Sequence, residues 1–330
     1  MEGSRTVLIV AEILESKPIS TAFELLALAK GVAKADGLAV SAVIFGSDSS
    51  DVAQSLIAGG ADQVFVAAEP SYAEYQSEIW IPVLLDAIKK ASADVVLFGH
   101  TNIGADLAPR LAFRLGGAVA MNCEGVRVEG GKLQVTRPCY GGKARADLWL
   151  KRSPSIVTVK AKSQKALPLD SARTGKVVRL DTTTDASKLR TVVKERRRYE
   201  VTGPQLETAK IVVGGGRGLG GPEGFQLLET LANKLGGVVG ASRVACDLGW
   251  CQPSMQIGLT GKTIAPDLYV AVGISGASQH MAGCGSAKII VAINPDREAP
   301  IFDDAGFGVV GDYKELLPKL IEEVQRQKSK

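Results

Sequence analysis

Short apolar runs rich in β-branched residues alternate with longer, helix-like stretches twice along this chain of 330 residues. Such alternation predicts a mostly parallel sheet with helices on both of its faces. In the first half, the spacing of apolar residues predicts strands at 7–11, 38–45, 63–67 and 94–99 and helices at 21–34, 51–58 and 81–91. Ser20 precedes the first of these helices and is expected to be its N-cap.

The stretch from residue 118 to residue 160 lacks a long helical pattern. Gly130 and Gly131 separate two short alternating segments, which is typical of a β-hairpin. Part of the sheet is therefore expected to be antiparallel, with strands at 126–128, 132–136, 144–150 and 156–160.

The alternating pattern returns at residue 209. Strands are expected at 209–213, 268–272, 288–294 and 306–310, and helices at 224–235 and 313–327. A chain of this length is typical of two domains. The segment 161–208, which carries the charged run Lys194–Arg198, separates the two halves. We predict one α/β domain over 1–160, a linker over 161–208 and a second α/β domain over 209–330.

Charge and cysteine content exclude several classes of protein. Lys and Arg number 39 against 35 Asp and Glu, and a net charge of +4 is too small for the basic face of a nucleic-acid-binding protein. No apolar run is long enough to cross a membrane. The five cysteines include no Cys-x-x-Cys pair, so no metal site is expected. A cytoplasmic protein is expected, or a mitochondrial matrix protein in a eukaryote.

A glycine-rich turn at 214–221 joins an expected strand to an expected helix. Its spacing, Gly216-x-Gly218-x-x-Gly221, matches the dinucleotide fingerprint. In such a turn, backbone N–H groups can close on a pyrophosphate, and the following helix adds its positive end. A tight turn without a ligand would give the same spacing. However, Arg217 adds a cation suited to a phosphate, which a structural turn does not need.

Two other loops follow expected strands in the same half. Gly273-Ile-Ser-Gly-Ala277 is similar to a hydrolase nucleophile elbow, but Ala277 stands where that motif needs glycine, so acyl transfer by Ser275 is not expected. The other loop region contributes polar and cationic residues at strand ends, where open α/β sheets bind ligands. These are Ser242, Arg243, Thr260 and Lys262.

In order along the chain, several multi-residue motifs resemble those of the α subunit of electron transfer flavoprotein. The motifs are Gly215–Leu219, Gly240–Arg243, Thr260–Lys262, Pro266–Tyr269, Gly273–Gly283, Val291–Asn294 and Ala299–Phe302. A less sharp resemblance at 104–112 and 136–142 extends it over nearly the whole chain.

The resemblance implies a heterodimer. The N-terminal domain would pack against a β subunit, and the C-terminal domain would be a Rossmann-like fold that holds FAD. A second FAD, or AMP, would be held mainly by the β subunit. The implied electron donor is an acyl-CoA-type or other flavin dehydrogenase, as in fatty acid β-oxidation. The implied acceptor is a quinone oxidoreductase or a ferredoxin.

The resemblance also implies the residues of the FAD site. They are Gly216, Arg217, Gly218, Ser242, Arg243, Ile257, Gly258, Leu259, Thr260, Ser275, Gly276, Ala277, Ser278, Gln279, His280, Asn294, Asp312 and Tyr313. Asn294 and Asp312 would lie near the adenosine end of the cofactor. The family commonly has Gln where this chain has Leu259, so Leu259 is expected to contribute only its backbone.

Three residues would face the isoalloxazine: Arg243, Thr260 and His280. An electron carrier must stabilise the anionic flavin semiquinone, and Arg243 is the natural fixed cation for that role. His280 would donate a hydrogen bond, and Thr260 would bond to flavin N5 or O4. No metal takes part.

Other functions remain open on these residues. The chain is expected to be an electron carrier rather than a stand-alone enzyme, but it could also belong to an electron-bifurcating complex that oxidises NADH. A non-redox regulatory module could use the same turns for an adenine nucleotide such as AMP or ATP. A nicotinamide-dependent dehydrogenase is disfavoured because residues 236–243 contain no acid to hold the ribose.

Overall fold

The computed structural model describes residues 6–46, 50–142, 144–181, 189–191, 193–195 and 206–328. It consists of two compact units, Met1–Arg196 and Arg197–Lys330. Each unit has its own parallel sheet, with a hydrophobic core on each face of it. Among the described residues, no helix is long and apolar enough to cross a membrane.

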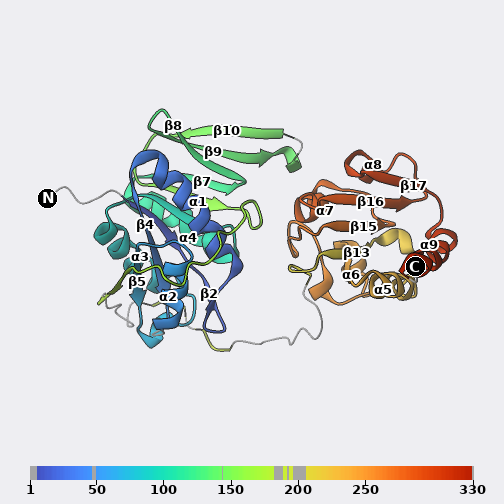
Figure 1. Ribbon diagram of the computed structural model, residues 1–330, viewed down its shortest axis with the longest axis horizontal. Helices are drawn as coiled ribbons and strands as arrows, with labels where there is room; N and C mark the ends of the chain where they lie inside the picture. Colours follow the sequence, from blue (N-terminus) through green and yellow to red (C-terminus); the bar gives the residue numbers. More distant parts are fainter. Residues whose placement is uncertain are drawn as a thin grey trace. The chain divides into compact units, whose positions relative to one another are not determined.

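The first unit, which contains the N-terminus, is built around a parallel sheet flanked by helices (Figure 1). The sheet has seven strands in the order β12-β5-β4-β1-β6-β11-β7. Its strands are β1 Thr6–Val10, β4 Ala39–Phe45, β5 Gln63–Ala67, β6 Ala93–Gly99, β7 Ala118–Cys123, β11 Ser155–Val159 and β12 Lys176–Arg179. A short hairpin, β2 Ile13–Leu14 and β3 Lys17–Pro18, follows β1.

Helices cover both faces of this sheet. They are α1 Ser20–Asp36, α2 Ser50–Ala58, α3 Ser77–Ala91 and α4 Asn102–Leu115, with a short 3-10 turn at Pro70–Tyr72. Successive residues of a strand point to opposite faces, so Val7 packs in the core beneath α1 and α2 while Leu8 packs in the core beneath α3 and α4. The predicted α/β class with helices on both faces is confirmed.

A separate three-stranded antiparallel sheet, ordered β10-β9-β8, is also part of the first unit. Its strands are β8 Gly125–Glu129, β9 Lys132–Cys139 and β10 Ala144–Leu150, with a 3-10 turn at Tyr140–Gly142. The predicted hairpin is confirmed, and both Gly130 and Gly131 have the positive φ that such a turn requires.

Two expectations for this unit are wrong. The expected strand at 156–160 does not join the antiparallel region, because β11 lies parallel between β6 and β7 in the large sheet. Ser20 is not the N-cap of α1. The helix begins at Ser20 itself, after Ile19, which provides no side-chain cap. Within the segment 161–208, β12 pairs in parallel with β5 at the sheet edge.

The second unit is a five-stranded parallel sheet with the order β14-β13-β15-β16-β17. Its strands are β13 Ile211–Gly215, β14 Val238–Ala241, β15 Leu268–Val272, β16 Ile289–Asn294 and β17 Phe307–Val310. Its helices are α5 Gly224–Leu235, α6 Arg243–Asp247, α7 Ser278–Cys284, α8 Ile301–Asp304 and α9 Tyr313–Lys328, with 3-10 turns at Arg217–Leu219 and Pro253–Met255.

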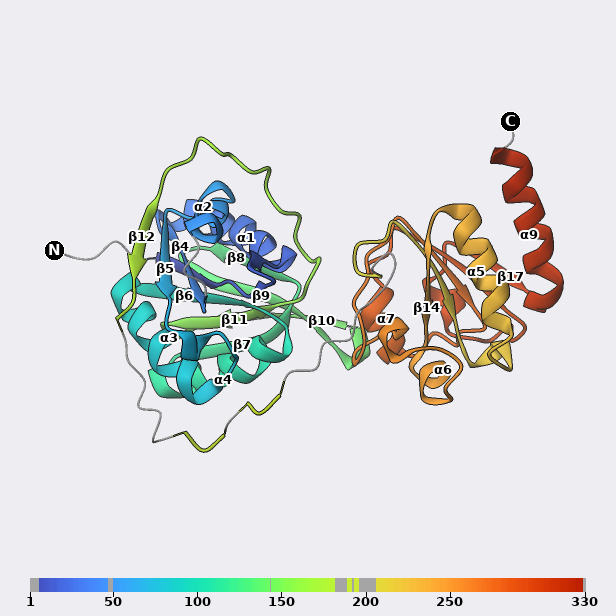
Figure 2. The ribbon, with the colours of Figure 1, turned by 90° about the horizontal axis from the view of Figure 1, so that it is seen from below.

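Two cores lie on opposite faces of this second sheet. Helices α5 and α9 lie side by side and bury Leu228 and Leu317 on one face (Figure 2). Cys284 of α7 and Ile301 of α8 are buried on the other. The strands end at one common edge, and that carboxyl edge is where ligands bind in open α/β sheets.

Candidate functional site

The carboxyl edge of the second sheet carries the predicted cofactor residues. β13 has β14 on one side and β15 on the other. From β13 the chain proceeds to β14 in one direction, and from β15 it proceeds to β16 and β17 in the opposite direction, so the strand order reverses between β13 and β15. Ligands in such sheets bind beside this reversal. Four of the five strands are followed at their carboxyl ends by predicted loops or residues, and β16 ends at the predicted residue Asn294. The sheet topology thus places segments that are up to about a hundred residues apart in sequence along one edge of the sheet.

The turn after β13 packs directly against the turn after β15. The amide of Gly216 donates to the carbonyl of Val272 at 2.9 Å, and that of Gly218 donates to the carbonyl of Gly273 at 2.9 Å. A Cβ atom at Gly216 would lie 2.2 Å from the Gly273 oxygen, so glycine is required for this approach.

These contacts change the expected role of the glycines. The Gly216 and Gly218 amides are already hydrogen-bonded within the chain, so in this conformation they serve loop packing rather than a pyrophosphate. Arg217 lies between them and is exposed. Its guanidinium is the charged group of this turn that can reach a phosphate.

Ser242 and Arg243 follow β14. The Ser242 amide donates to the Gly215 carbonyl at 2.9 Å, which holds the start of α6 beside the glycine-rich turn. Arg243 is the first residue of α6, and its Nε lies 3.3 Å from Oδ2 of Asp247. Both side chains of this ion pair are about two-thirds exposed, at 66% and 62%. An ion pair this exposed is weak, so Arg243 can turn toward a bound anion at little cost.

The loop at 256–262 is tied to the turn that precedes α7. The Leu259 amide donates to the Gln279 carbonyl at 2.7 Å, so the backbone group expected to serve the cofactor has a partner in the chain. Thr260 is exposed, and its hydroxyl accepts a 2.9 Å hydrogen bond from Nε2 of Gln256. Gln256 was not among the predicted site residues, although it is a polar residue of the same loop.

His280 is buried, with 7% of its surface exposed. Its Nε2 lies 2.8 Å from the hydroxyl of Tyr269, a fully buried residue of β15. Its buried Nδ1 has no hydrogen-bond partner among the residues that the structure describes. Burial lowers the pKa of His280 to about 4, and the backbone of Ile257 only partly opposes this effect. The ring is therefore neutral at neutral pH.

The unpartnered Nδ1 of His280 is what one expects at a binding site where a bound group supplies the missing hydrogen-bond partner. A buried nitrogen without a partner costs about 1–3 kcal/mol, and a ligand that supplies the missing partner recovers that energy. In the same turn, Ser275, Ala277 and Gln279 are exposed, Ser278 is half-buried and Gly276 is buried. The residues present are thus chemically suited to a polar ring system and a phosphate.

Three predicted residues lie at the far strands of this edge, and two of them hold neighbouring loops in place. Asn294 is buried; its Nδ2 donates to the Ile274 carbonyl at 2.9 Å, and its Oδ1 accepts from the Asp296 amide at 2.9 Å. The Tyr313 hydroxyl donates to the Leu219 carbonyl at 2.7 Å. Asp312 is exposed and accepts from the Lys314 amide. In this conformation Asn294 and Tyr313 position the loops, and Asp312 alone of the three faces solvent.

The corresponding edge of the first unit carries a hydrogen-bonded pair of the chain's own side chains. Its strand order reverses between β1 and β6, where Thr101 donates to Oε1 of Glu12 at 2.5 Å. The same Thr101 hydroxyl accepts from the Gly104 amide and so caps α4. Burial raises the pKa of Glu12, although the bond from Thr101 opposes this effect.

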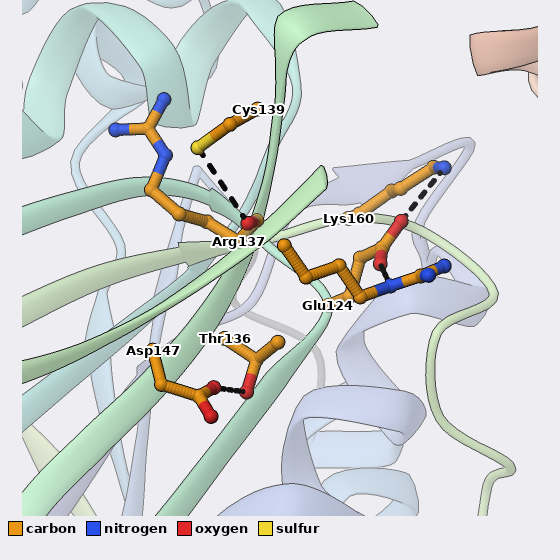
Figure 3. Close-up of polar contacts among 7 residues, drawn as sticks. Glu124, Thr136, Arg137, Cys139, Asp147 and Lys160 are labelled. Carbon is orange, nitrogen blue, oxygen red and sulfur yellow. Dashed lines mark hydrogen bonds and ion pairs between the residues drawn. The ribbon is translucent and has the colours of Figure 1, made fainter. Parts of the chain in front are cut away.

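A charged cluster around Glu124 joins the two sheets of the first unit (Figure 3). Glu124 lies between β7 and β8 and accepts from Nε of Arg145 at 2.9 Å and from Nζ of Lys160 at 3.3 Å. Burial acts to raise the pKa of Glu124, but the bond from Arg145 and the charge of Lys160 hold it below its ordinary value. In Figure 3, Arg137 extends away from this cluster. The cluster connects β10 and β11, so we assign it a structural role.

Comparison with known sequences decides the family. Residues 7–185 match the electron transfer flavoprotein domain, and residues 205–285 match the electron transfer flavoprotein FAD-binding domain. The chain belongs to the electron transfer flavoprotein α-subunit family. The resemblance found in the motifs is thereby confirmed.

Relatives in this family align over nearly the whole chain. The electron transfer flavoprotein subunit alpha of Thermoanaerobacterium thermosaccharolyticum is 40% identical over 330 residues, covering 99% of this chain and 100% of that protein. The subunit alpha of Bacillus subtilis is 41% identical over 323 residues, or 98% of each chain. A third relative, the acryloyl-CoA reductase electron transfer subunit beta of Anaerotignum propionicum, is 33% identical over 359 residues, covering 98% of this chain and 97% of that protein.

The FAD-binding match coincides with the carboxyl edge described above. It extends from before β13 to the first residue after α7 and so includes the predicted residues from Gly216 to His280. Asn294, Asp312 and Tyr313 lie beyond it. The electron transfer flavoprotein subunit thus carries its FAD-binding domain in the second unit.

Proposed function

We propose that this chain holds FAD along the carboxyl edge of its second unit and passes electrons as one half of a heterodimer with a β subunit. The observation that carries this proposal is the coincidence of two independent features. The residues that match the FAD-binding domain are the ones that form the loops after β13, β14 and β15. The strand order reverses at the same place.

Bound FAD would supply the redox chemistry, since its ring takes up and releases electrons one or two at a time. The chain supplies binding and electrostatics. Arg217 would bind the pyrophosphate from the turn after β13. Arg243 would leave its exposed ion pair with Asp247 and place a permanent positive charge near the ring. Thr260, held by Gln256, would offer its hydroxyl to the polar edge of the ring.

His280 and Arg243 would have different electrostatic roles. A histidine with a pKa near 4 is uncharged at neutral pH, so His280 can offer a hydrogen bond but not a charge. The Tyr269 hydroxyl fixes one ring nitrogen and leaves Nδ1 for the cofactor. Of the three residues proposed to face the ring, Arg243 is the one with a fixed charge, since a guanidinium keeps its charge at all relevant pH values.

The partners are proposed from the family. The first unit would pack against the β subunit, which would hold a second FAD or AMP. The relative named for acryloyl-CoA reductase supports an enzyme that acts on an acyl-CoA as a redox partner. In the direction proposed here, an acyl-CoA-type or other flavin dehydrogenase would donate the electrons. A quinone oxidoreductase or a ferredoxin would receive the electrons, in the cytoplasm. We retain the division into 1–160, 161–208 and an FAD-binding domain over 209–330 as part of this proposal.

The test is to produce the full chain together with its β subunit and to measure flavin content. We expect a yellow complex that releases FAD on denaturation and is bleached by dithionite. Arg217→Ala should weaken FAD retention, whereas Lys319→Ala on α9 should not. A colourless complex that gains no flavin spectrum on reconstitution with FAD, yet binds AMP or ATP, would replace this proposal with a non-redox nucleotide-binding role.

The same preparation distinguishes two modes of electron transfer. One FAD with one AMP for each heterodimer supports simple transfer from a dehydrogenase to an acceptor. Two FAD for each heterodimer together with oxidation of NADH supports bifurcation instead. Both counts come from acid extraction and separation of the released nucleotides.

A further inference from the structure

Two cysteine sulfurs lie close together in the second unit, at the end of α6. Sγ of Cys246 and Sγ of Cys251 are 3.3 Å apart, and both residues are free thiols. Cys246 is buried, with 9% of its surface exposed, while Cys251 is half-buried. The pair is not part of the FAD site proposed above.

The backbone holds the two sulfurs in place. After Cys246 the chain turns back, because the Gly249 amide donates to the Cys246 carbonyl at 2.9 Å and the Trp250 amide donates to the Ala245 carbonyl at 3.1 Å. Gly249 has a φ of +73°, a value that favours glycine. Trp250 and Cys251 pack against the core beneath α5 and α9. The proximity of the sulfurs is therefore fixed by the turn and by packing.

We propose that Cys246 and Cys251 form a redox-active dithiol that a hydroperoxide converts to an intramolecular disulfide. A disulfide bond is about 2.0 Å long, so the sulfurs must approach by about 1.3 Å for the bond to form. Disulfides of this transient, oxidant-dependent kind are the ones found in reducing compartments. The inference needs only the two thiols and does not depend on FAD.

The chemistry balances in two steps. The Cys251 thiolate attacks one oxygen of the peroxide, the O–O bond breaks, and the sulfur becomes a sulfenic acid while the other oxygen leaves as water or alcohol. Cys246 then attacks the Cys251 sulfur, the S–O bond breaks, and the hydroxyl leaves as water with the Cys246 proton. In total, two thiols are oxidised by two electrons and one peroxide is reduced.

The surroundings assign the two roles. Cys251 is the more exposed sulfur, so a peroxide reaches it first. Burial raises the pKa of both thiols, to about 12 for Cys246, where the neighbouring Cys251 and Asp247 add to the effect. The hydrogen bond between the two sulfurs only partly offsets the effect of burial on Cys251, whose pKa stays raised. Exposure therefore assigns the roles: Cys251 is the attacking sulfur and Cys246 the resolving one.

The disulfide would connect two segments that carry proposed FAD residues. Cys246 shares α6 with Arg243, and Cys251 leads through Pro253–Met255 to Gln256 and Thr260. Oxidation would join these segments covalently at a point outside the ring contacts themselves.

The test uses the full-length chain, treated with hydrogen peroxide and then labelled with iodoacetamide after unfolding. Trypsin releases residues 244–262 as one peptide that holds both cysteines, and residues 133–143 as a peptide that holds Cys139 as the internal control. We expect the first peptide to lose two hydrogen atoms and take no label after oxidation, and to take two labels after reduction by dithiothreitol. Cys139 should remain alkylated throughout.

Two further measurements test the dithiol, and the first of them needs no variant. Phenylarsine oxide, which bridges neighbouring thiols, should protect both cysteines of the untreated chain from labelling at one arsenic per chain. In Cys246→Ser, dimedone should trap a sulfenic acid on Cys251, whereas Cys251→Ser should give at least tenfold less adduct on Cys246. Independent labelling of the two thiols after peroxide, or equal adducts in the two variants, would overturn the proposal or its assignment of roles.

Discussion

The hydroxyl of Tyr269 lies 2.8 Å from Nε2 of His280, with both side chains buried in the second unit. Gly214 makes room for this contact, because a Cβ atom there would lie 2.3 Å from the hydroxyl oxygen. The lack of a side chain at Gly214 therefore permits a hydrogen bond of His280, which lies sixty-six residues further along the chain. The contact fixes the orientation of the His280 ring and leaves Nδ1 without a partner among the described residues.

The depressed pKa of His280 makes the second unit less stable in acid. In the unfolded chain the imidazole takes up a proton near pH 6.5, whereas in the folded chain it does so only near pH 4. The free energy of unfolding should therefore decrease as the pH falls between these values, by about 3 kcal/mol from this residue. Urea titrations at a series of pH values measure it. His280→Gln should flatten this part of the profile, and a variant whose profile runs parallel to the parent would contradict the assignment.

Substitution of Gly216 should damage the glycine-rich turn. In Gly216→Ala the new methyl group would meet the backbone of Gly273, which cannot move without breaking the bonds between the two turns. We expect a loss of about 1–3 kcal/mol in stability together with weaker FAD retention, measured by urea unfolding and flavin release. Gly31→Ala in α1 is the control. Nothing lies within 4 Å of that position, so it should stabilise the chain by about 0.5–1 kcal/mol.

Arg243→Ala should change the cofactor more than the fold. The ion pair with Asp247 is exposed, so its loss should leave the thermal midpoint nearly unchanged. Loss of a positive charge near the ring should lower the midpoint potential for the first electron by on the order of 60 mV, which corresponds to a tenfold change in the equilibrium constant. Spectroelectrochemical titration measures it. Arg326→Ala, which removes another exposed ion pair in the same unit, should leave the potential unchanged. Equal potentials in both variants would remove Arg243 from this role.

Glu124→Gln should destabilise the first unit at neutral pH. The substitution removes the charge that pairs with Arg145 and Lys160, and we expect a cost of about 1–3 kcal/mol in the free energy of unfolding. Because the folded-state pKa of Glu124 is lowered, its contribution is present above the unfolded pKa and lost as the pH falls through the folded one. The unfolding curves of parent and variant should then converge in acid. Glu129→Gln, in an exposed pair with Arg127, is the control, and a similar cost there would contradict the prediction.

The local sequence predicted the positions of individual strands and helices better than it predicted which strands pair with each other. The bounds of β5, β15 and α5 were predicted as observed, because turn residues or polar residues flank each run. β11 was expected as a strand, but its neighbours β6 and β7 are distant in sequence, and an apolar run does not specify which strand it pairs with. α4 was not among the expected helices, since Pro109 interrupts its pattern.

The candidate site was predicted at the level of loops and less well at the level of side chains. The glycine-rich motifs identified the loops that the topology gathers after β13, β14 and β15. They did not indicate that Gly216 and Gly218 donate to the end of β15, or that Gln256 occupies the Thr260 hydroxyl. Such contacts depend on how distant segments pack, which the spacing within one motif does not encode.

At the carboxyl edge of the second sheet, the residues that hold the turns after β13 and β15 together differ from the residues that are exposed beside them. Backbone atoms and glycines hold the two turns together, whereas the exposed residues beside them, such as Arg217 and Ser275, take no part in that docking. Substitution of the exposed residues should therefore leave the docking of the two turns intact. At such positions a change of charge would act on a bound cofactor at little cost in stability.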